Sequence, residues 1–308
     1  KFTSFEEVMD AFRRQLEYNV KVAAEATNLK DLAYEDFPAP FVSSTLKGCI
    51  ESGKDVTEGG AKYNFASITA RGLGTTTDSL AAIKKLVFED KVLTMHELIK
   101  LLKTNFKGKE EIRQMMITRV PNYGNDDDYV DSIAKEIVET FCKEVTKHSS
   151  IRGGHFRPSF YSYGTHVLDG LFLGATPDGR KACEPISNGI SPTNRREGMG
   201  PTAVLKSAAK LNHKLVTNGD ALNLRLHPSL LQNEEGLRKV ASLIRTYFDL
   251  GGMHVQFNVV SSEMLRDAQR HPEKYKDLVV RVSGYSAFFT DLGKSIQDDI
   301  IARTEFGF

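Results

Sequence analysis

The chain has 308 residues, 41 basic and 40 acidic side chains, a formal net charge of +1 and three cysteines. Its length can bury a sizeable core, and its balanced charge gives no electrostatic case for binding nucleic acid or an anionic membrane surface. Charges interrupt the long apolar runs, and the sparse cysteines argue against a disulfide framework, so we expect a cytoplasmic protein without a membrane span.

The N-terminal third is predicted to be mostly helical, because apolar residues recur there at helical spacing. Thr77 or Asp78 is expected to cap the second helix, and Thr94 with Glu97 forms a capping-box pattern for the third. The acidic run at residues 126–128 enters the fourth helix, where negative charge in the first turn favours the helix dipole. The predicted helices cover residues 5–20, 80–88, 94–102 and 128–145.

From residue 149 to residue 219 the chain is rich in glycine, proline, serine and asparagine, with aromatic residues and histidines interleaved. Such stretches form flexible or functional loops, and the interleaved rings favour ordered ones. In the last third, strands and helices alternate, which predicts an α/β architecture with a buried sheet. Helices are expected at residues 237–250, 262–270 and 295–304, and strands at residues 253–260 and 278–282.

A glycine near the C-terminus is the main candidate for chemistry. Residues 278–282 read as a buried strand that leads into Gly284. A glycine at a strand end usually serves a turn or a close backbone approach. Its missing Cβ also allows a radical at Cα to become planar and conjugate with both neighbouring peptide groups. We expect Tyr285, Phe288 and Phe289 to keep water and oxygen away from it.

Residues 281–287 (RVSGYSA), 297–301 (QDDII) and 303–305 (RTE) together resemble the signature of glycyl radical enzymes, the pyruvate formate-lyase superfamily. A lone glycine turn would be structural, but a signature of this length favours function. Further blocks resemble the catabolic branch, which includes glycerol, propanediol and hydroxyproline dehydratases. These blocks are residues 58–65 (EGGAKYNF), 78–85 (DSLAAIKK), 124–128 (GNDDD), 176–180 (TPDGR) and 200–207 (GPTAVLKS).

The resemblance implies an α/β fold in which two five-stranded half-barrels form a ten-stranded β/α barrel with surrounding helices. Residues 1–180 would be the C-terminal part of the barrel domain, and residues 181–308 the glycine radical domain with its loop. A homodimer is also expected. The chain would hold no bound cofactor and no metal.

The resemblance also implies a mechanism. A separate iron–sulfur activating enzyme that uses S-adenosylmethionine removes a hydrogen atom from Cα of Gly284. The glycyl radical then oxidises a cysteine thiol on a facing loop. The resulting thiyl takes a hydrogen atom from a small-molecule substrate, which rearranges and takes the hydrogen back.

The position of the catalytic cysteine stays open. The Gly-Cys-Ile-Glu run around Cys49 imitates the family's cysteine loop, but its place just before residues 58–65 matches a downstream helical block. Cys49 is therefore the weaker candidate for the thiyl, against a buried small hydrophobe. Cys142 is expected in the core, and Cys183 has no base beside it in sequence. Since no initiator methionine begins the chain, we expect a fragment whose thiyl cysteine, acid/base glutamate and N-terminal half-barrel lie upstream.

Other side chains have a functional and a structural interpretation. Tyr161 matches by position a tyrosine that approaches the substrate pocket in the dehydratases, where a phenol can hydrogen-bond the substrate; aromatic packing is the alternative. His155 and His166 flank the same segment as general acids or, as we favour, as hydrogen-bonding groups that fix the loop. Residues 126–128 resemble a cation site, but without a spaced partner carboxylate helix entry is favoured.

Three functions fit the sequence. The first is a radical lyase that eliminates water or another leaving group from a small polyol, amino alcohol or hydroxy acid. The second keeps the family but decarboxylates its substrate or adds it to fumarate. The third is a non-catalytic, radical-bearing module that docks on a damaged partner. Residues 68–76 (ITARGLGTT) depart from the dehydratase pattern, so the subfamily stays open.

Overall fold

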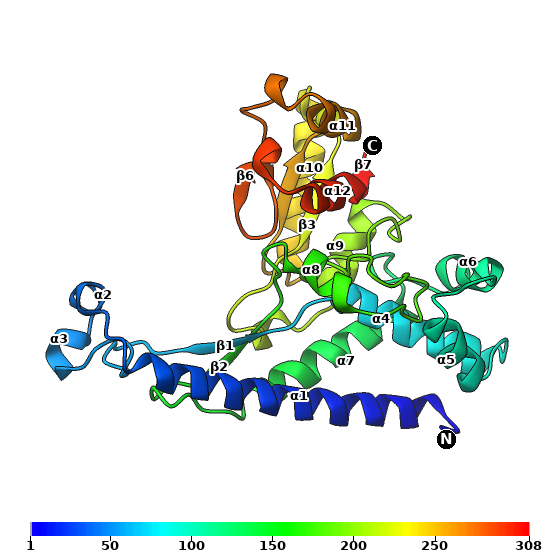
Figure 1. The fold of residues 1–308 in the computed structure, drawn as a ribbon. Coiled ribbons are helices and arrows are strands. Elements are labelled where there is room, and N and C mark those ends of the chain that lie inside the picture. Colours follow the sequence, from blue (N-terminus) through cyan, green and yellow to red (C-terminus); the bar gives the residue numbers. More distant parts are fainter. Residues whose placement is uncertain (1, 308) are drawn as a thin grey trace.

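The base of the molecule is a stack of long helices. A computed structural model describes residues 2–307. Helix α1 (Phe5–Tyr34) packs on α7 (Asp128–Val145), and α7 packs on α4 (Leu73–Ala82) (Figure 1). Their apolar side chains meet in one large core. The side chains of Ser4 and Asp127 cap α1 and α7 by accepting backbone hydrogen bonds, as predicted for the acidic entry to α7.

Shorter helices surround this stack. The predicted capping box is confirmed, because Thr94 and Glu97 exchange hydrogen bonds at the start of α5. Helices α2 and α3 form an arm that projects away from the rest of the molecule, on the left in Figure 1. The helices are α2 (Pro40–Thr45), α3 (Cys49–Ser52), the π-helical η1 (Ile83–Glu89), α5 (Met95–Lys103) and α6 (Glu110–Thr118).

The start of α4 differs from the prediction. This helix begins at Leu73, directly after Gly72 with its φ of +79°, and not behind a cap at Thr77 or Asp78. Both of those residues are buried inside the helix, where Asp78 accepts a hydrogen bond from the backbone N–H of Tyr123 at 2.8 Å. Glycine and threonine have low helix propensity, so packing on α7 outweighs a local preference that pointed elsewhere.

The strands are short and mainly parallel. They are β1 (Ala66–Thr69), β2 (Phe156–Ser159), β3 (Asn223–Leu226), β4 (Gln256–Val259) and β7 (Glu305–Phe306). Strand β1 pairs with β2, while β3 lies between β4 and β7. A parallel bridge between Phe160 and Asp220 joins the two sheets. The predicted α/β architecture is confirmed, and its five parallel strands form two small sheets that this bridge connects.

The C-terminal residues add a second, smaller core (Figure 1, top). Strand β5 (Val279–Arg281) forms an antiparallel hairpin with β6 (Ser286–Phe288), packed near α11 (Ser262–Arg270) and α12 (Lys294–Ala302). The strand was expected to be buried throughout, but Val279 is 55% exposed, because only one face of the hairpin packs on the core. The core consists of Val260, Leu265, Ala268, Val280, Val282, Phe289 and Ile300.

The remaining elements connect the two cores. The predicted helix at residues 237–250 is confirmed as α10, which begins slightly earlier and ends before Gly251, at φ +101°. The glycine-rich region from residue 149 to residue 219 is mostly ordered loop with two helices. These elements are α8 (Thr165–Phe172), α9 (Pro201–Ala209), α10 (Glu234–Asp249) and the short turns η2 (His213–Leu215), η3 (Pro228–Leu231), η4 (Pro272–Lys274) and η5 (Phe289–Asp291).

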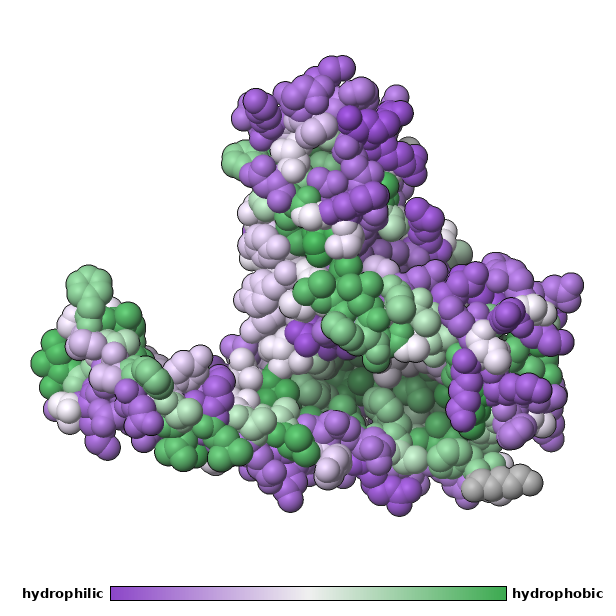
Figure 2. All heavy atoms as spheres, in the orientation of Figure 1, coloured by the Kyte–Doolittle hydropathy of each residue, from purple (hydrophilic) through white to green (hydrophobic). Residues whose placement is uncertain are grey.

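Apolar side chains gather on two parts of the surface. Figure 2 shows them over α8 and over the arm formed by α2 and α3. Exposed apolar patches of this kind are typical of surfaces that contact another protein. Within residues 2–307, no helix combines the length and the apolar character needed to cross a bilayer. The exposed residues are Leu168, Leu171 and Phe172 on α8, and Phe41, Val42 and Ile50 on the arm.

Replacing Phe160 with alanine is expected to lower the free energy of unfolding by about 3–5 kcal/mol. Its ring is 1% exposed and meets Phe141 edge-on at a centroid distance of 5.1 Å. Phe172→Ala is the matched control, because that ring is 89% exposed and its loss should change stability by about 0.5 kcal/mol or less. Urea unfolding followed by circular dichroism measures both, and equal losses would contradict the core position of Phe160.

Candidate functional site

Gly284 lies at the tip of the β5–β6 hairpin. Val282 donates its backbone N–H to the carbonyl of Tyr285 at 2.9 Å, which closes the tip. Gly284 has a φ of +82°, a left-handed conformation that residues with a side chain rarely adopt. A Cβ at this position would lie 3.2 Å from Cε1 of Tyr163. Both the backbone conformation and the close approach of the ring therefore favour glycine here.

The aromatic residues after Gly284 do not shield it as the sequence predicted. Gly284 is exposed in the described chain, and Tyr285 and Phe288 are 39% and 46% exposed. Phe289 is buried, but as part of the second core. Successive side chains of a strand point to opposite faces, so Phe288 faces outward while Phe289 packs inward. The ring that approaches the glycine most closely is that of Tyr163, which the sequence analysis did not single out.

Three tyrosines lie in a row beside the hairpin tip. The rings of Tyr161 and Tyr163 meet edge-on with centroids 4.8 Å apart, and the rings of Tyr163 and Tyr285 are 6.5 Å apart. The Tyr161 hydroxyl accepts a hydrogen bond from the side-chain amide of Asn218 at 3.0 Å. The structure thus brings Tyr161 toward Gly284 through one intervening ring, with its hydroxyl oriented by a fixed donor.

A buried polar network lies behind the hairpin tip. Ser283 Oγ and Ser162 Oγ both donate to Oδ1 of Asn188, at 2.8 Å and 2.6 Å. Ser162 Oγ also lies 3.0 Å from Nδ1 of His166. The Ser162 hydroxyl therefore lies between Asn188 and His166. The residue directly before Gly284 is therefore fixed to the loop that precedes α8, and the prediction that His166 fixes this loop is confirmed.

The network continues into an ion pair on α12. Oδ2 of Asp299 lies 3.1 Å from Nε2 of His166 and 3.0 Å from Nη2 of Arg303. Arg303 in turn donates to the carbonyls of Val282 at 2.8 Å and Arg281 at 3.2 Å. Burial alone would raise the pKa of Asp299, but the positive charge of Arg303, helped by His166, holds that pKa well below its usual range. The ionised carboxylate keeps Arg303 in place against the hairpin backbone.

Taken together, these contacts hold the residues before Gly284, while Gly284 itself stays exposed. Arg281 and Val282 are held by their carbonyls, and Ser283 by its hydroxyl. The side chain of Asn258, on β4, also donates a hydrogen bond to the carbonyl of Arg281 and accepts one from its backbone N–H. The arrangement presents an unsubstituted α-carbon from a rigid frame. His155, by contrast, is exposed and takes no part in it.

The structure does not bring Cys49 to Gly284. Cys49 is 4% exposed in α3, on the arm that Figure 1 places far from the hairpin. Cys142 is buried in α7 as predicted, and burial raises the pKa of its thiol to about 12. Cys183 is exposed, and its backbone N–H donates to the carbonyl of Leu173. The buried-hydrophobe interpretation fits the surroundings of Cys49.

The acidic run before α7 serves helix entry, as predicted. Asp127 caps the helix, while Asp126 and Asp128 pair with Nζ of Lys210 at 2.9 Å and 2.7 Å. Across the part of the chain that the structure describes, no group of three or more histidine, cysteine or acidic side chains is arranged to hold a metal ion.

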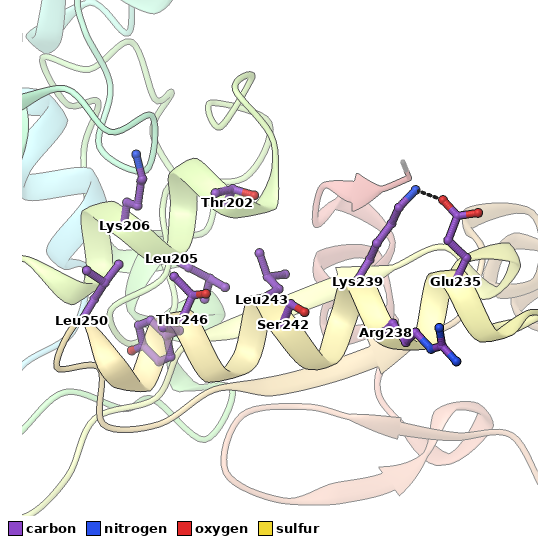
Figure 3. Close-up of a pocket in the computed structure, with 11 residues that line it drawn as sticks. Thr202, Leu205, Lys206, Glu235, Arg238, Lys239, Ser242, Leu243, Thr246 and Leu250 are labelled. Carbon is purple, nitrogen blue, oxygen red and sulfur yellow. Dashed lines mark ion pairs between the residues drawn. The ribbon is translucent and has the colours of Figure 1, made fainter.

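A groove of about 470 Å³ between α9 and α10 lies apart from this site (Figure 3). Leu205, Leu243 and Leu250 form its apolar wall, and an ion pair between Lys239 and Glu235 at 2.7 Å lies at one end. None of its lining residues belongs to the hairpin or to the polar network, so we do not assign it to the site.

Two family models match the chain. The model described as pyruvate formate lyase-like matches residues 1–170, and the model described as glycine radical matches residues 186–290. Gly284 and the buried partners Asn188 and Ser283 fall within the second match. The first match covers the helix stack and strands β1 and β2.

Individual proteins are similar over the whole chain. The trans-4-hydroxy-L-proline dehydratase of Clostridioides difficile is 44% identical over 99% of this chain, and the (2S)-3-sulfopropanediol dehydratase of Klebsiella oxytoca is 42% identical over 100%. The glycerol-bound glycerol dehydratase of Clostridium butyricum has a TM-score of 0.96 at 46% identity and covers 100% of this chain. The chain spans 38% of the length of the two curated relatives and 39% of the solved one.

Gly284→Ala is expected to destabilise the hairpin by about 1–2 kcal/mol, because the left-handed conformation is unfavourable for alanine. Contact with Tyr163 adds to that cost. Gly293→Ala is the control, since Gly293 has a φ of −59° and open space around it. Amide hydrogen exchange of residues 279–288 measures the effect. Unchanged protection in Gly284→Ala would show that the tip does not adopt this conformation.

Asp299→Asn is expected to lower the free energy of unfolding by about 3–5 kcal/mol, because it leaves the buried Arg303 without its counter-charge. Asp298→Asn is the control on the same helix. Asp298 pairs with Lys294 at the surface, where loss of a pair costs about 1 kcal/mol or less. Urea unfolding at neutral pH compares the two, and equal losses would contradict the role of Asp299.

The same carboxylate predicts an acid dependence. Its pKa in the folded protein lies below the value of about 3.9 expected in the unfolded chain, so it stabilises the fold above that pH. This contribution should be lost as pH falls below about 4 toward the folded pKa. Unfolding measured from neutral to acid pH should show a steeper loss for the unmodified protein than for Asp299→Asn. Parallel curves would count against the ion pair.

Proposed function

We infer the function from one premise, that the chain belongs to the pyruvate formate lyase-like glycyl radical enzymes. The proposed activity is that of a radical lyase, a dehydratase or eliminase acting on a small polyol, amino alcohol or hydroxy acid. Support comes from the relatives named above, which are dehydratases of hydroxyproline, sulfopropanediol and glycerol. Because the chain spans well under half of their length, the activity belongs to a longer assembly of which this chain is the radical-bearing part.

Gly284 is the proposed radical carrier, and its position at the hairpin tip is the observation that carries the proposal. It lies within the glycine radical match, in a left-handed conformation, and is exposed in the described chain. Loss of one hydrogen atom there leaves a carbon that conjugates with the peptide groups on both sides. A side chain would crowd that planar geometry and meet the ring of Tyr163.

The proposed sequence of hydrogen transfers needs groups beyond this chain. An activating enzyme, of the iron–sulfur and S-adenosylmethionine class, takes one hydrogen atom from Cα of Gly284. The glycyl radical then takes a hydrogen atom from a cysteine thiol and leaves a thiyl, which takes one from the substrate carbon. The substrate radical loses water and regains the hydrogen atom from the thiol. The position of Cys49 on the arm favours a thiyl cysteine outside the 308 residues.

The domain division follows the same proposal. The chain would supply the second half-barrel, with residues 1–180 as the C-terminal part of the barrel domain and residues 181–308 as the glycine radical domain. Two observations support this division. The first family match ends at residue 170 and the second begins at residue 186, and the C-terminal hairpin has a hydrophobic core of its own. Tyr161, oriented by Asn218, is the proposed substrate contact.

Anaerobic activation of the full-length protein, followed by electron paramagnetic resonance, tests the proposal. The expected doublet comes from the remaining α-hydrogen of Gly284 and should collapse when glycine deuterated at Cα is incorporated. Gly284→Ala should abolish the signal, whereas Gly293→Ala should keep it. Air should then cut the activated backbone at Gly284 and release a short C-terminal peptide. A signal that survives in Gly284→Ala would refute the assignment.

A further inference from the structure

A second cleft lies beside β3, between the segment that follows β4 and the start of β7. Its volume is about 550 Å³, within the range of about 300–1,000 Å³ typical of small-molecule sites. Here β3 supplies Arg225, the segment after β4 supplies Ser262, and β7 supplies Glu305. The cleft shares Arg303 with the polar network, but Gly284 does not line it.

Four arginines line this cleft; Arg303 is paired with Asp299, and the other three face two lining carboxylates. Glu305 is committed to the start of α11, where it accepts hydrogen bonds from N–H and Oγ of Ser262 at 2.8 Å and 2.5 Å. Burial raises the pKa of Glu197, so its carboxyl group binds a proton more readily than an exposed one. The cleft therefore has an excess of positive charge. The arginines are Arg195, Arg225, Arg266 and Arg303.

Arg225, at the floor of the cleft, is 2% exposed and incompletely satisfied. Its Nη2 donates to Ser262 Oγ at 2.9 Å and to the carbonyl of Arg303, and its Nη1 donates to the carbonyl of Ile300 at 3.4 Å. Its Nε has no hydrogen-bond partner among residues 2–307. Its Nη2 forms a long ion pair with Oε2 of Glu305 at 3.6 Å. A buried N–H without a partner is costly, so the described chain does not fully compensate this guanidinium group.

Two further arginines lie at the rim and are free to bind. Within the described chain, the guanidinium groups of Arg195 and Arg266 make no side-chain hydrogen bond or ion pair, and both residues are exposed. Arg195 has a φ of +65°, held by its backbone N–H, which donates to Oγ1 of Thr304 at 3.2 Å. Like charges held close together without partners repel one another, so an anion between them is stabilising.

We propose that this cleft binds a phosphate group, as free phosphate or as a small phosphate monoester, between Arg195, Arg225 and Arg266. The forked donors of arginine match phosphate oxygens, and a phosphate offers the two negative charges and several acceptors that this excess requires. A carboxylate would bring one charge only. Arg225 also holds the carbonyls of Ile300 and Arg303, so an occupied cleft steadies the end of α12, from which Arg303 reaches the hairpin.

Isothermal titration calorimetry of the protein with inorganic phosphate and with methyl phosphate, at an ionic strength fixed by chloride, tests the proposal. Arg266→Gln keeps helix propensity, and Arg195→Asn suits the left-handed backbone, so both variants should fold. The double variant should bind phosphate about tenfold more weakly or worse, because two charge-assisted contacts are lost. Arg270→Gln, one turn further along α11 and outside the cleft, should stay within about twofold.

The outcomes separate the two sources of phosphate. Tighter binding of methyl phosphate identifies an ester as the natural ligand, and equal or tighter binding of inorganic phosphate identifies the free ion. The proposal is overturned if no saturable binding is seen, if the double variant and Arg266→Gln bind like the unmodified protein, or if Arg270→Gln loses as much affinity. None of these readouts uses radical chemistry, so they are independent of the role of Gly284.

Discussion

The buried carboxylate of Asp299 is the constraint on which the hairpin depends. It lies between His166 of α8 and Arg303. Arg303 also donates hydrogen bonds to the carbonyls of Arg281 and Val282. Charges are costly to bury, so this group is stable only while all of its partners stay in place. The position of Gly284 is therefore set by polar contacts between two hydrophobic cores, and not by apolar packing around the glycine.

Much of the fold could be predicted because its signals are local. The helix at residues 128–145 and the capping box of Thr94 were evident from periodicity and cap residues, and both are confirmed. The start of α4 was missed because Gly72 and the threonines that follow read as loop. The division of the strands into two sheets depends on distant pairing, such as Phe160 with Asp220, which leaves no local pattern.

The site, too, could be predicted where its signals are local and not where they depend on distant contacts. Gly284 was found through a long signature around it, but its supports were not, because Ser162 and Asn188 are short polar residues 121 and 95 positions away from Ser283. The expected aromatic shield was wrong, since the alternation of a hairpin strand turns Phe288 outward. Any further cover over Gly284 has to come from outside residues 2–307, in keeping with the much greater length of the relatives.

In the left-handed conformation of Gly284, its two α-hydrogens have different surroundings. One points where a Cβ would lie, toward the ring of Tyr163, and the other points away from it. While the tip keeps this position, the ring of Tyr163 hinders approach to the carbon from the side of the first hydrogen. Loss of hydrogen from this state would be stereospecific, and a glycine carrying deuterium on one prochiral face would keep or lose its label accordingly.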